Sequence, residues 1–256
     1  FLSNFGSLDI NQGDYIVIPK GVTWQIQINE KMHFLIIESK HPVSTPDRYR
    51  NEFGQLLEHA PFCERDIQTP NFENPKNDEE IEVKVKVNGG IQSYIYSYHP
   101  FDLIGWDGYY FPYILNINNF MPITGKIHQP PPVHQTFKSN GFVICSFVPR
   151  LFDYHPKAIP APYAHSNVDS DEIIFYSKGK FMSRKGIEEE SITFHPSGLP
   201  HGPQPGKIEE SLGAKETNEI AIMIDTFKPL KTTHRINEID DKDYPLSWLE
   251  NDLRPR

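Results

Sequence analysis

The sequence predicts an all-β fold, a sandwich or a barrel, on three observations. Short runs rich in β-branched and aromatic residues recur along the chain, with turn signals between them. Proline is abundant, with 23 in 256 residues, against an average share of about 5%, and it disfavours long helices because it lacks a backbone donor. Several runs alternate apolar and polar residues, which is typical of strands with one buried face. We therefore expect few and short helices.

The expected strands follow from these runs. The clearest are residues 14–18, 22–28, 34–38, 81–87, 91–96, 142–147, 172–176 and 219–225. The first three predict a small antiparallel sheet near the start of the chain. Gly89 and Gly90 predict a hairpin turn between the fourth and fifth runs. The aromatic segment 101–122 predicts a packed corner of the core.

Composition and charge exclude several classes of function. The net charge is -9 and no basic cluster is present, which argues against nucleic-acid binding, since that binding needs basic residues. We expect no membrane span, because no apolar run reaches about 18 residues. Cys63 and Cys145 lie far apart, so we expect no disulfide framework and a reducing cytoplasm. The first residue is Phe1 rather than Met, which leads us to expect a fragment.

The first chemical motif pairs a loop histidine with a strand glutamate. His165 precedes Glu172 by seven positions, and Gly179 follows by another seven, in the pattern H-x6-E-x6-G. Glu172 opens an apolar strand, so an imidazole and a carboxylate can converge at one end of a barrel. Asp169 and Asp171 are rival carboxylates, which we expect to face solvent.

The second motif adds another imidazole. Pro196, Gly198 and His201 form the pattern P-x-G-x-x-H, in which a tight turn lets the histidine project inward. Two imidazoles and one carboxylate leave open coordination positions and suit the Fe(II) of oxygenases. A lone histidine in a β protein is usually structural, and H-x6-E alone is a weak signal. The two motifs in this order together predict a metal site.

These motifs resemble the two motifs of the cupin superfamily, and their flanks resemble the homogentisate 1,2-dioxygenase family. The segments that carry the resemblance are 14–21, 100–113, 118–121, 147–150, 162–167 and 200–203. The resemblance implies a cupin-type β-barrel, or jelly roll. It also implies two parts. Residues 1–100 would be the remnant of a metal-free N-terminal cupin half with its connection, and residues 101–256 a metal-binding C-terminal half with its tail.

The resemblance also implies an activity. Members of that family use Fe(II) to open the ring of homogentisate with O2, giving maleylacetoacetate, in the catabolism of phenylalanine and tyrosine. By resemblance the iron ligands are His165, Glu172 and His201. The partners would be a small aromatic acid and O2, and the protein would be a homo-oligomer, a trimer or a hexamer.

The same resemblance suggests further site residues. The family's catalytic histidine falls on His128, which would accept or steer the phenolic proton, as suits a group that titrates near neutral pH. A surface role for His128 is the alternative, and His134 is the local rival. The expected substrate-binding residues are Tyr163, Phe181, His195 and His201.

The sequence departs from the family pattern beside the first ligand and in the pocket. Ala164 and Phe181 stand where the family usually has tyrosines, Ser166 stands where it has an arginine, and one extra residue separates the first ligand from the glutamate. A second hypothesis is therefore a diverged dioxygenase for another hydroxylated aromatic acid. A non-catalytic, metal-binding or structural cupin is a third. A zinc or manganese isomerase is a fourth, since fold does not fix function.

Overall fold

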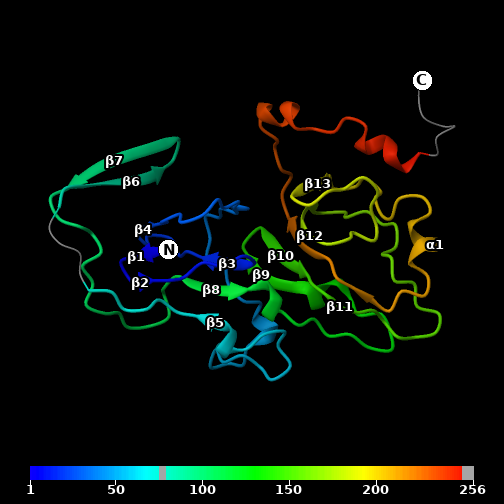
Figure 1. Cartoon of the computed structure of the whole chain (residues 1–256), viewed down its shortest axis with the longest axis horizontal. Coiled ribbons are helices and arrows are strands. Elements are labelled where there is room, and N and C mark those ends of the chain that lie inside the picture. Colours follow the sequence, from blue (N-terminus) through cyan, green and yellow to red (C-terminus); the bar gives the residue numbers. More distant parts are fainter. Residues whose placement is uncertain (75–78, 250–256) are drawn as a thin grey trace. The chain divides into compact units, whose positions relative to one another are not determined.

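The computed structural model describes residues 1–74 and 79–249, and strands are its main regular structure (Figure 1). Within these residues the α-helical structure is confined to α1 (Lys207–Ser211), which is five residues long. The predicted all-β fold with few and short helices is therefore confirmed. No helix of the described residues is long and apolar enough to cross a membrane.

The chain forms two compact units. Unit 1 comprises residues 1–43 and 63–119, and unit 2 comprises residues 44–62 and 120–256. Residues 44–62, which belong to the predicted first part, thus pack within unit 2. Residues 101–119, which belong to the predicted second part, pack within unit 1. The division into two cupin halves at residue 100 stays a prediction.

Unit 1 is built from short strands in three small sheets with the orders β2-β1-β4, β3-β8-β5 and β6-β7. Their bounds are β1 (Leu2–Ser3), β2 (Gly6–Ser7), β3 (Asp14–Val17), β4 (Trp24–Gln25), β5 (Ile67–Gln68), β6 (Ile81–Val87), β7 (Gly90–Tyr96) and β8 (Tyr113–Asn116). β8 is the middle strand of the second sheet, and its Ile114 is fully buried. Ile114 packs with Phe1 and Leu8 in a hydrophobic core, so that segments far apart in the sequence stabilise one another.

The hairpin of β6 and β7 confirms the turn predicted from its glycines (Figure 1). The strands pair from Ile81 opposite Tyr96 to Val87 opposite Gly90. Gly89 has a φ of 90°, a conformation that favours glycine. The alternation of residues 81–87 predicts one buried face, but in β6 only Ile81 and Val83 are partly buried, and β7 is exposed along its whole length.

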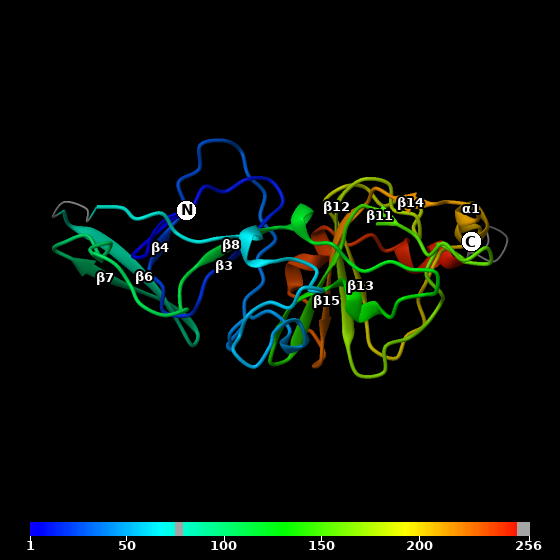
Figure 2. The ribbon, with the colours of Figure 1, turned by 90° about the horizontal axis from the view of Figure 1, so that it is seen from below.

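Unit 2 holds the sheet that positions the predicted ligands. Its strands are β9 (Gln135–Ser139), β10 (Phe142–Phe147), β11 (Arg150–Leu151), β12 (Asp171–Lys178), β13 (Ser191–His195), β14 (Glu216–Thr217) and β15 (Ile220–Thr226). Five of these form an antiparallel sheet in the order β13-β12-β15-β10-β9, and Figure 2 shows β12, β13 and β15 side by side. β11 pairs with β14. Within the described residues β13 does not pair with β9, so closure into a cupin barrel stays a prediction.

The remaining regular segments are 3-10 turns. They are η1 (Asp47–Tyr49), η2 (Glu64–Asp66), η3 (Ile117–Asn119), η4 (Pro131–His134), η5 (His234–Glu238) and η6 (Tyr244–Trp248). η4 and η6 carry proline in their first turn, where its fixed φ suits a helical start. η6 matters for the site, because Tyr244 returns to β13 and hydrogen-bonds His195.

Three predictions about unit 1 are corrected. The runs 14–18 and 22–28 do not share the predicted small sheet, because β3 pairs with β8 and β4 pairs with β1. Residues 34–38 form no strand, and Ile36 is 84% exposed; within the described residues no partner strand pairs with this run. The aromatic segment 101–122 is buried at Phe101 and Phe120, but Ile104 and Tyr109 are 84% and 93% exposed. The packed corner is therefore wrong for the middle of that segment, because burial depends on which neighbours reach it.

Candidate metal centre

The two predicted histidine ligands lie on segments that pair with each other. The His165 amide donates to the His201 carbonyl at 2.8 Å, and the His201 amide donates to the His165 carbonyl at 2.8 Å. This two-way bridge fixes the backbone of both residues, and their rings lie 4.5 Å apart between centroids. The turn that precedes His201 thus places the second imidazole against the first, as the sequence motif predicts.

Glu172 completes the cluster from β12. One potential ligand atom from each of His165, Glu172 and His201 lies within 4.8 Å of the others. Glu172 and His201 are buried, whereas His165 is partly exposed. The cluster therefore has two buried members and one open side, as a site that admits a small molecule requires.

The hydrogen bonds of the two histidines leave one nitrogen of each ring free to bind a metal. His165 Nδ1 lies 3.1 Å from the Tyr163 carbonyl, and His201 Nδ1 lies 3.0 Å from the Leu199 carbonyl. A carbonyl only accepts, so each neutral ring carries its proton on Nδ1 and presents a lone pair at Nε2. His201 Nε2 is buried and has no hydrogen-bond partner. Metal-binding histidines are typically oriented in this way, and the residues present fit a metal ion.

The Glu172 carboxylate supplies the negative charge. Its Oε1 lies 2.7 Å from His195 Nδ1 and 3.5 Å from His201 Nε2. Burial raises the pKa of the Glu172 carboxyl, but the hydrogen bond from His195 and the contact with His201 outweigh burial and hold the pKa below its usual range. Glu172 is therefore an anion at neutral pH and is ready to bind a cation.

Comparison with known proteins relates this chain to dioxygenases. The family profile described as "Homogentisate 1,2-dioxygenase N-terminal" matches residues 1–117. A candidate dioxygenase of Saccharolobus solfataricus is 45% identical over 250 residues, which cover 97% of this chain and 65% of that protein. Homogentisate 1,2-dioxygenase of Nitrobacter hamburgensis is 26% identical over 266 residues, covering 97% of this chain and 58% of that protein. The chain is therefore similar to homogentisate 1,2-dioxygenases along nearly its whole length, and its first 117 residues match the N-terminal model of that family.

These similarities confirm the resemblance to homogentisate 1,2-dioxygenases that the motifs carry. A second homogentisate 1,2-dioxygenase, from Bradyrhizobium diazoefficiens, is also 26% identical, over 96% of this chain and 58% of that protein. The chain thus spans between 58% and 65% of the length of these relatives.

His195, predicted as a substrate-binding residue, has both ring nitrogens in hydrogen-bond contact with other protein groups. It is buried, its Nδ1 contacts Glu172, and its Nε2 lies 3.0 Å from the Tyr244 hydroxyl. Its ring stacks on that of His201, with centroids 4.4 Å apart and planes 11° apart. Burial lowers the pKa of His195, against the pull of Glu172, so the ring is neutral near pH 7.

His128 and Tyr163, predicted as catalytic and substrate-binding residues, form a chain of ring contacts that ends at His165. The His128 ring meets Tyr163 at 6.3 Å between centroids, and Tyr163 meets His165 at 5.5 Å. His128 is exposed, and its Nδ1 lies 3.3 Å from Asp153 Oδ2. Its rival His134 packs against Phe147 instead.

Phe181, another predicted substrate-binding residue, contacts a different ring. It packs against Tyr176 at 4.7 Å between centroids in an edge-on arrangement. Tyr176 is buried, and its hydroxyl lies 3.2 Å from Thr193 Oγ1. The substrate-binding roles of Phe181, Tyr163 and His195 stay predictions.

The two rival carboxylates behave differently from each other. Asp169 is exposed, as predicted, but Asp171 is only 3% exposed, so the prediction that it faces solvent is wrong. Asp171 Oδ1 accepts a hydrogen bond from the Ser197 amide at 2.8 Å, and Oδ2 accepts one from the Leu230 amide at 2.7 Å. Neighbouring strand residues point to opposite faces of a sheet. Asp171 therefore holds the backbone at Ser197 and Leu230 by hydrogen bonds, while Glu172 faces the histidines.

Three residues near the cluster, one buried and two partly buried, escape sequence reasoning. Asp225 lies opposite Glu172 in the pairing of β12 and β15, and burial together with the Glu172 charge raises its pKa to about 6. Arg184 donates to the Gly202 carbonyl at 2.6 Å, and its guanidinium lies over Trp248. The third is Tyr244. The sequence gives no spacing signal for any of them, because each reaches the cluster only through the fold.

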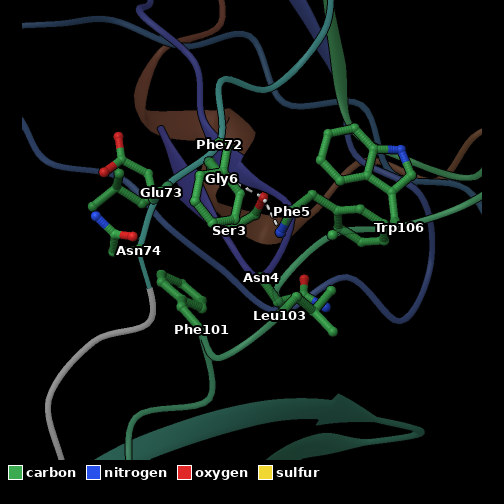
Figure 3. Close-up of a pocket in the computed structure, with 12 residues that line it drawn as sticks. Ser3, Asn4, Phe5, Gly6, Phe72, Glu73, Asn74, Phe101, Leu103 and Trp106 are labelled. Carbon is green, nitrogen blue, oxygen red and sulfur yellow. Dashed lines mark hydrogen bonds between the residues drawn. The ribbon is translucent and has the colours of Figure 1, made fainter.

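A shallow hollow in unit 1 is a separate feature. Figure 3 shows Phe5, Phe72, Phe101 and Trp106 around it, and all of its lining residues belong to unit 1. Phe5 and Trp106 meet edge to face at 5.5 Å between centroids. The lining holds no ligand of the metal cluster, so the hollow is not part of the candidate centre.

Proposed function

We propose that this chain is the main part of an Fe(II)-dependent ring-cleaving dioxygenase that converts homogentisate and O2 to maleylacetoacetate. The observation that carries the proposal is the His165–Glu172–His201 cluster, with ligand atoms within 4.8 Å of one another, in a chain similar to homogentisate 1,2-dioxygenases. Two imidazoles and one carboxylate with open positions are the ligand set of non-haem Fe(II) oxygenases.

The charges of the cluster suit this chemistry. Two neutral rings and one carboxylate leave a bound dication with a net positive charge, which attracts an acidic substrate. A ferrous ion held there would supply the redox chemistry that adds dioxygen to an aromatic ring. The protein's own residues hold the ion through His165 Nε2, His201 Nε2 and Glu172, and the exposed side of His165 gives substrate its approach.

The environment of Arg184 supports the proposal that the substrate is an acid. It is only 7% exposed, its Nε has no hydrogen-bond partner, and within the described residues no carboxylate lies in ion-pair range of it. Burial and, to a smaller extent, the Arg184 charge lower the pKa of His195, whereas the contact with Glu172 raises the pKa of His201 against the Arg184 charge. A buried cation without a counter-ion is costly, and the carboxylate of an aromatic acid would supply that counter-ion.

His128 is the proposed proton acceptor. Asp153 lies beside Nδ1 at 3.3 Å, and a neutral His128 that donates there presents its Nε2 lone pair as a base. The Tyr163 ring contacts both His128 and His165, so a phenolic hydroxyl held over Tyr163 would lie between base and ligand. General acid–base catalysis of this kind typically contributes about 100- to 10,000-fold in rate.

Oxygen uptake tests the proposal. Protein loaded anaerobically with Fe(II) is given homogentisate, and O2 consumption and ring-opened product are measured together. We expect stoichiometric uptake in the wild type and in His59→Ala, which removes an exposed histidine, and none in His201→Ala. Iron binding without uptake would reject homogentisate as the substrate.

A second substrate hypothesis has its own support. Ala164, Ser166 and Phe181 replace residues usual in the family, and the Phe181 ring offers no hydroxyl to a polar substrate. A pocket built around fewer hydrogen bonds favours a different partner. Uptake with another hydroxylated aromatic acid, but not with homogentisate, would establish the diverged dioxygenase. Iron binding with no uptake on any such acid would establish the non-catalytic cupin.

Assembly belongs to the same proposal. The family resemblance predicts a homo-trimer or a hexamer. Light scattering on purified protein tests it, and a monomeric mass would reject it.

A further inference from the structure

Three residues form an unbroken line of hydrogen bonds that ends at the metal cluster. The Tyr244 hydroxyl lies 3.0 Å from His195 Nε2, and His195 Nδ1 lies 2.7 Å from Glu172 Oε1. Glu172 belongs to β12, His195 to the end of β13, and Tyr244 to η6, so the line joins two neighbouring strands to the C-terminal segment.

The direction of each proton follows from the groups involved. An ionised carboxylate only accepts, so His195 Nδ1 carries a proton and donates it to Glu172. A neutral His195 then has a bare Nε2, which accepts from the Tyr244 hydroxyl. Burial raises the pKa of Tyr244 to about 12, so that hydroxyl keeps its proton. With His195 neutral, every polar atom in the line thus has one role.

We propose that Tyr244 is a positioning residue of the metal centre, whose hydroxyl locks the ring and tautomer of His195 so that His195 holds the Glu172 carboxylate in place. The inference rests on the proposed metal site and extends it to a residue that contacts neither metal nor substrate. Partners that orient metal ligands in this way typically change metal affinity by about 10- to 100-fold when they are removed.

The segment that carries Tyr244 is anchored to the residues just after the last ligand. The Trp248 Nε1 donates to the Gly202 carbonyl at 3.1 Å, and Gln204 Nε2 donates to Ser247 Oγ at 2.5 Å. Trp248 also meets the Tyr244 ring edge-on at 5.1 Å between centroids. η6 is therefore fastened to the chain beside His201, which gives Tyr244 a fixed position relative to the cluster.

Tyr244→Phe removes only the hydroxyl and keeps the packed ring. The first measurement is 15N NMR of the imidazoles in metal-free protein labelled with 15N-histidine, with His195 assigned by the signals lost in His195→Gln. We expect wild-type His195 to be protonated at Nδ1, and Tyr244→Phe to move its Nε2 resonance toward that of an unbonded acceptor. A wild-type proton on Nε2, or an unchanged Nε2 resonance in the variant, would overturn the proposal.

The second measurement is Co(II) affinity, by competition with a chelator and by the visible spectrum of the bound ion. We expect Tyr244→Phe to bind Co(II) at least 10-fold more weakly and with an altered spectrum. The matched control is Tyr154→Phe, which removes the hydroxyl of an exposed tyrosine in the same unit and should bind as the wild type does. Equal affinity and identical spectra in Tyr244→Phe would reject the positioning role.

The two proposals fail in different ways. If wild-type protein binds no Co(II) or Fe(II), the metal centre is wrong, and the metal part of the positioning role falls with it. The NMR result still decides whether Tyr244 fixes His195. If the wild type binds metal and Tyr244→Phe binds it equally well, the metal centre stands and the positioning role does not.

Discussion

His165 and His201 are joined through both backbone amides, at 2.8 Å in each direction. The bridge is isolated from the main sheet, so the spacing of the two imidazoles depends on this local pairing. What keeps the two segments in contact is therefore as important to the centre as the imidazoles themselves.

Gly202→Ala should separate the two segments. A Cβ at Gly202 would lie 2.6 Å from Ala164 Cα and 3.0 Å from Ala164 Cβ, on the residue just before His165. The backbone has to move, at a cost of about 1–3 kcal/mol in the free energy of unfolding, and metal affinity should fall with it. Urea unfolding and Co(II) titration measure both effects. Gly90→Ala, where a Cβ meets nothing within 4 Å, is the control; a Gly202→Ala protein that binds metal normally would show that the bridge tolerates the shift.

Asp171→Asn should destabilise the protein, whereas Asp169→Asn should not. Asp171 accepts from the Leu230 and Ser197 amides, and an asparagine presents an NH2 group to one of them. One buried amide is then unpaired, at about 1–3 kcal/mol. Urea unfolding of both variants at pH 7 is the measurement. Equal stabilities of the two variants would contradict the role given to Asp171.

The same carboxylate predicts a pH dependence. The Leu230 and Ser197 amides lower the pKa of Asp171 below its ordinary 3.8. In the pH range between the folded and unfolded pKa values the unfolded chain binds the extra proton, so this stabilisation is fully present above pH 3.8 and is lost as pH falls further. The stability difference between wild type and Asp171→Asn should therefore shrink below pH 3.8. A difference that stays constant down to pH 3 would show that the charge of Asp171 is not what stabilises the loops.

His134 should make the protein lose stability on acidification at a higher pH than Asp171 does. Burial, reinforced by the Arg150 charge, lowers the pKa of His134 from 6.5 to about 3. Between these values the unfolded chain binds a proton that the folded one does not. The free energy of unfolding therefore decreases as the pH is lowered, by at most about 1.4 kcal/mol per pH unit. His134→Phe keeps a ring against Phe147 and removes this slope between pH 6.5 and 5. Unfolding free energies across that range test it, with His59→Ala as the exposed control; parallel slopes in wild type and His134→Phe would refute it.

The sequence predicts those parts of this protein that depend on local pattern. β10, β12 and β15 follow from β-branched runs, and the ligand cluster follows from two motifs whose turns fix where the side chains point. Residues 34–38 show the same composition but form no strand, because a strand needs a partner and the partner is not encoded locally. The alternation of side chains along a strand could have predicted that Asp171 faces away from Glu172 and the metal cluster, since neighbouring strand residues point to opposite faces. Tyr244 and Arg184 meet the site only through the tertiary fold, so no spacing indicates them.

His165→Ala and His128→Ala should separate metal binding from catalysis. His165 Nε2 is a predicted ligand, so its loss should abolish iron binding. His128 is exposed and contacts the cluster only through the Tyr163 ring, so His128→Ala should bind iron as the wild type does.

The rate of the His128 variant decides its role. If His128 accepts the substrate proton, His128→Ala should lose about 100- to 10,000-fold in kcat. Metal content by elemental analysis and kcat across pH 5.5 to 8.5 measure the two properties. A His128→Ala enzyme with wild-type kcat would reject His128 as the proton acceptor. His134 could not replace it, because that ring packs against Phe147 and stays neutral far below pH 7. The proton would then have to leave through solvent at the exposed side of His165.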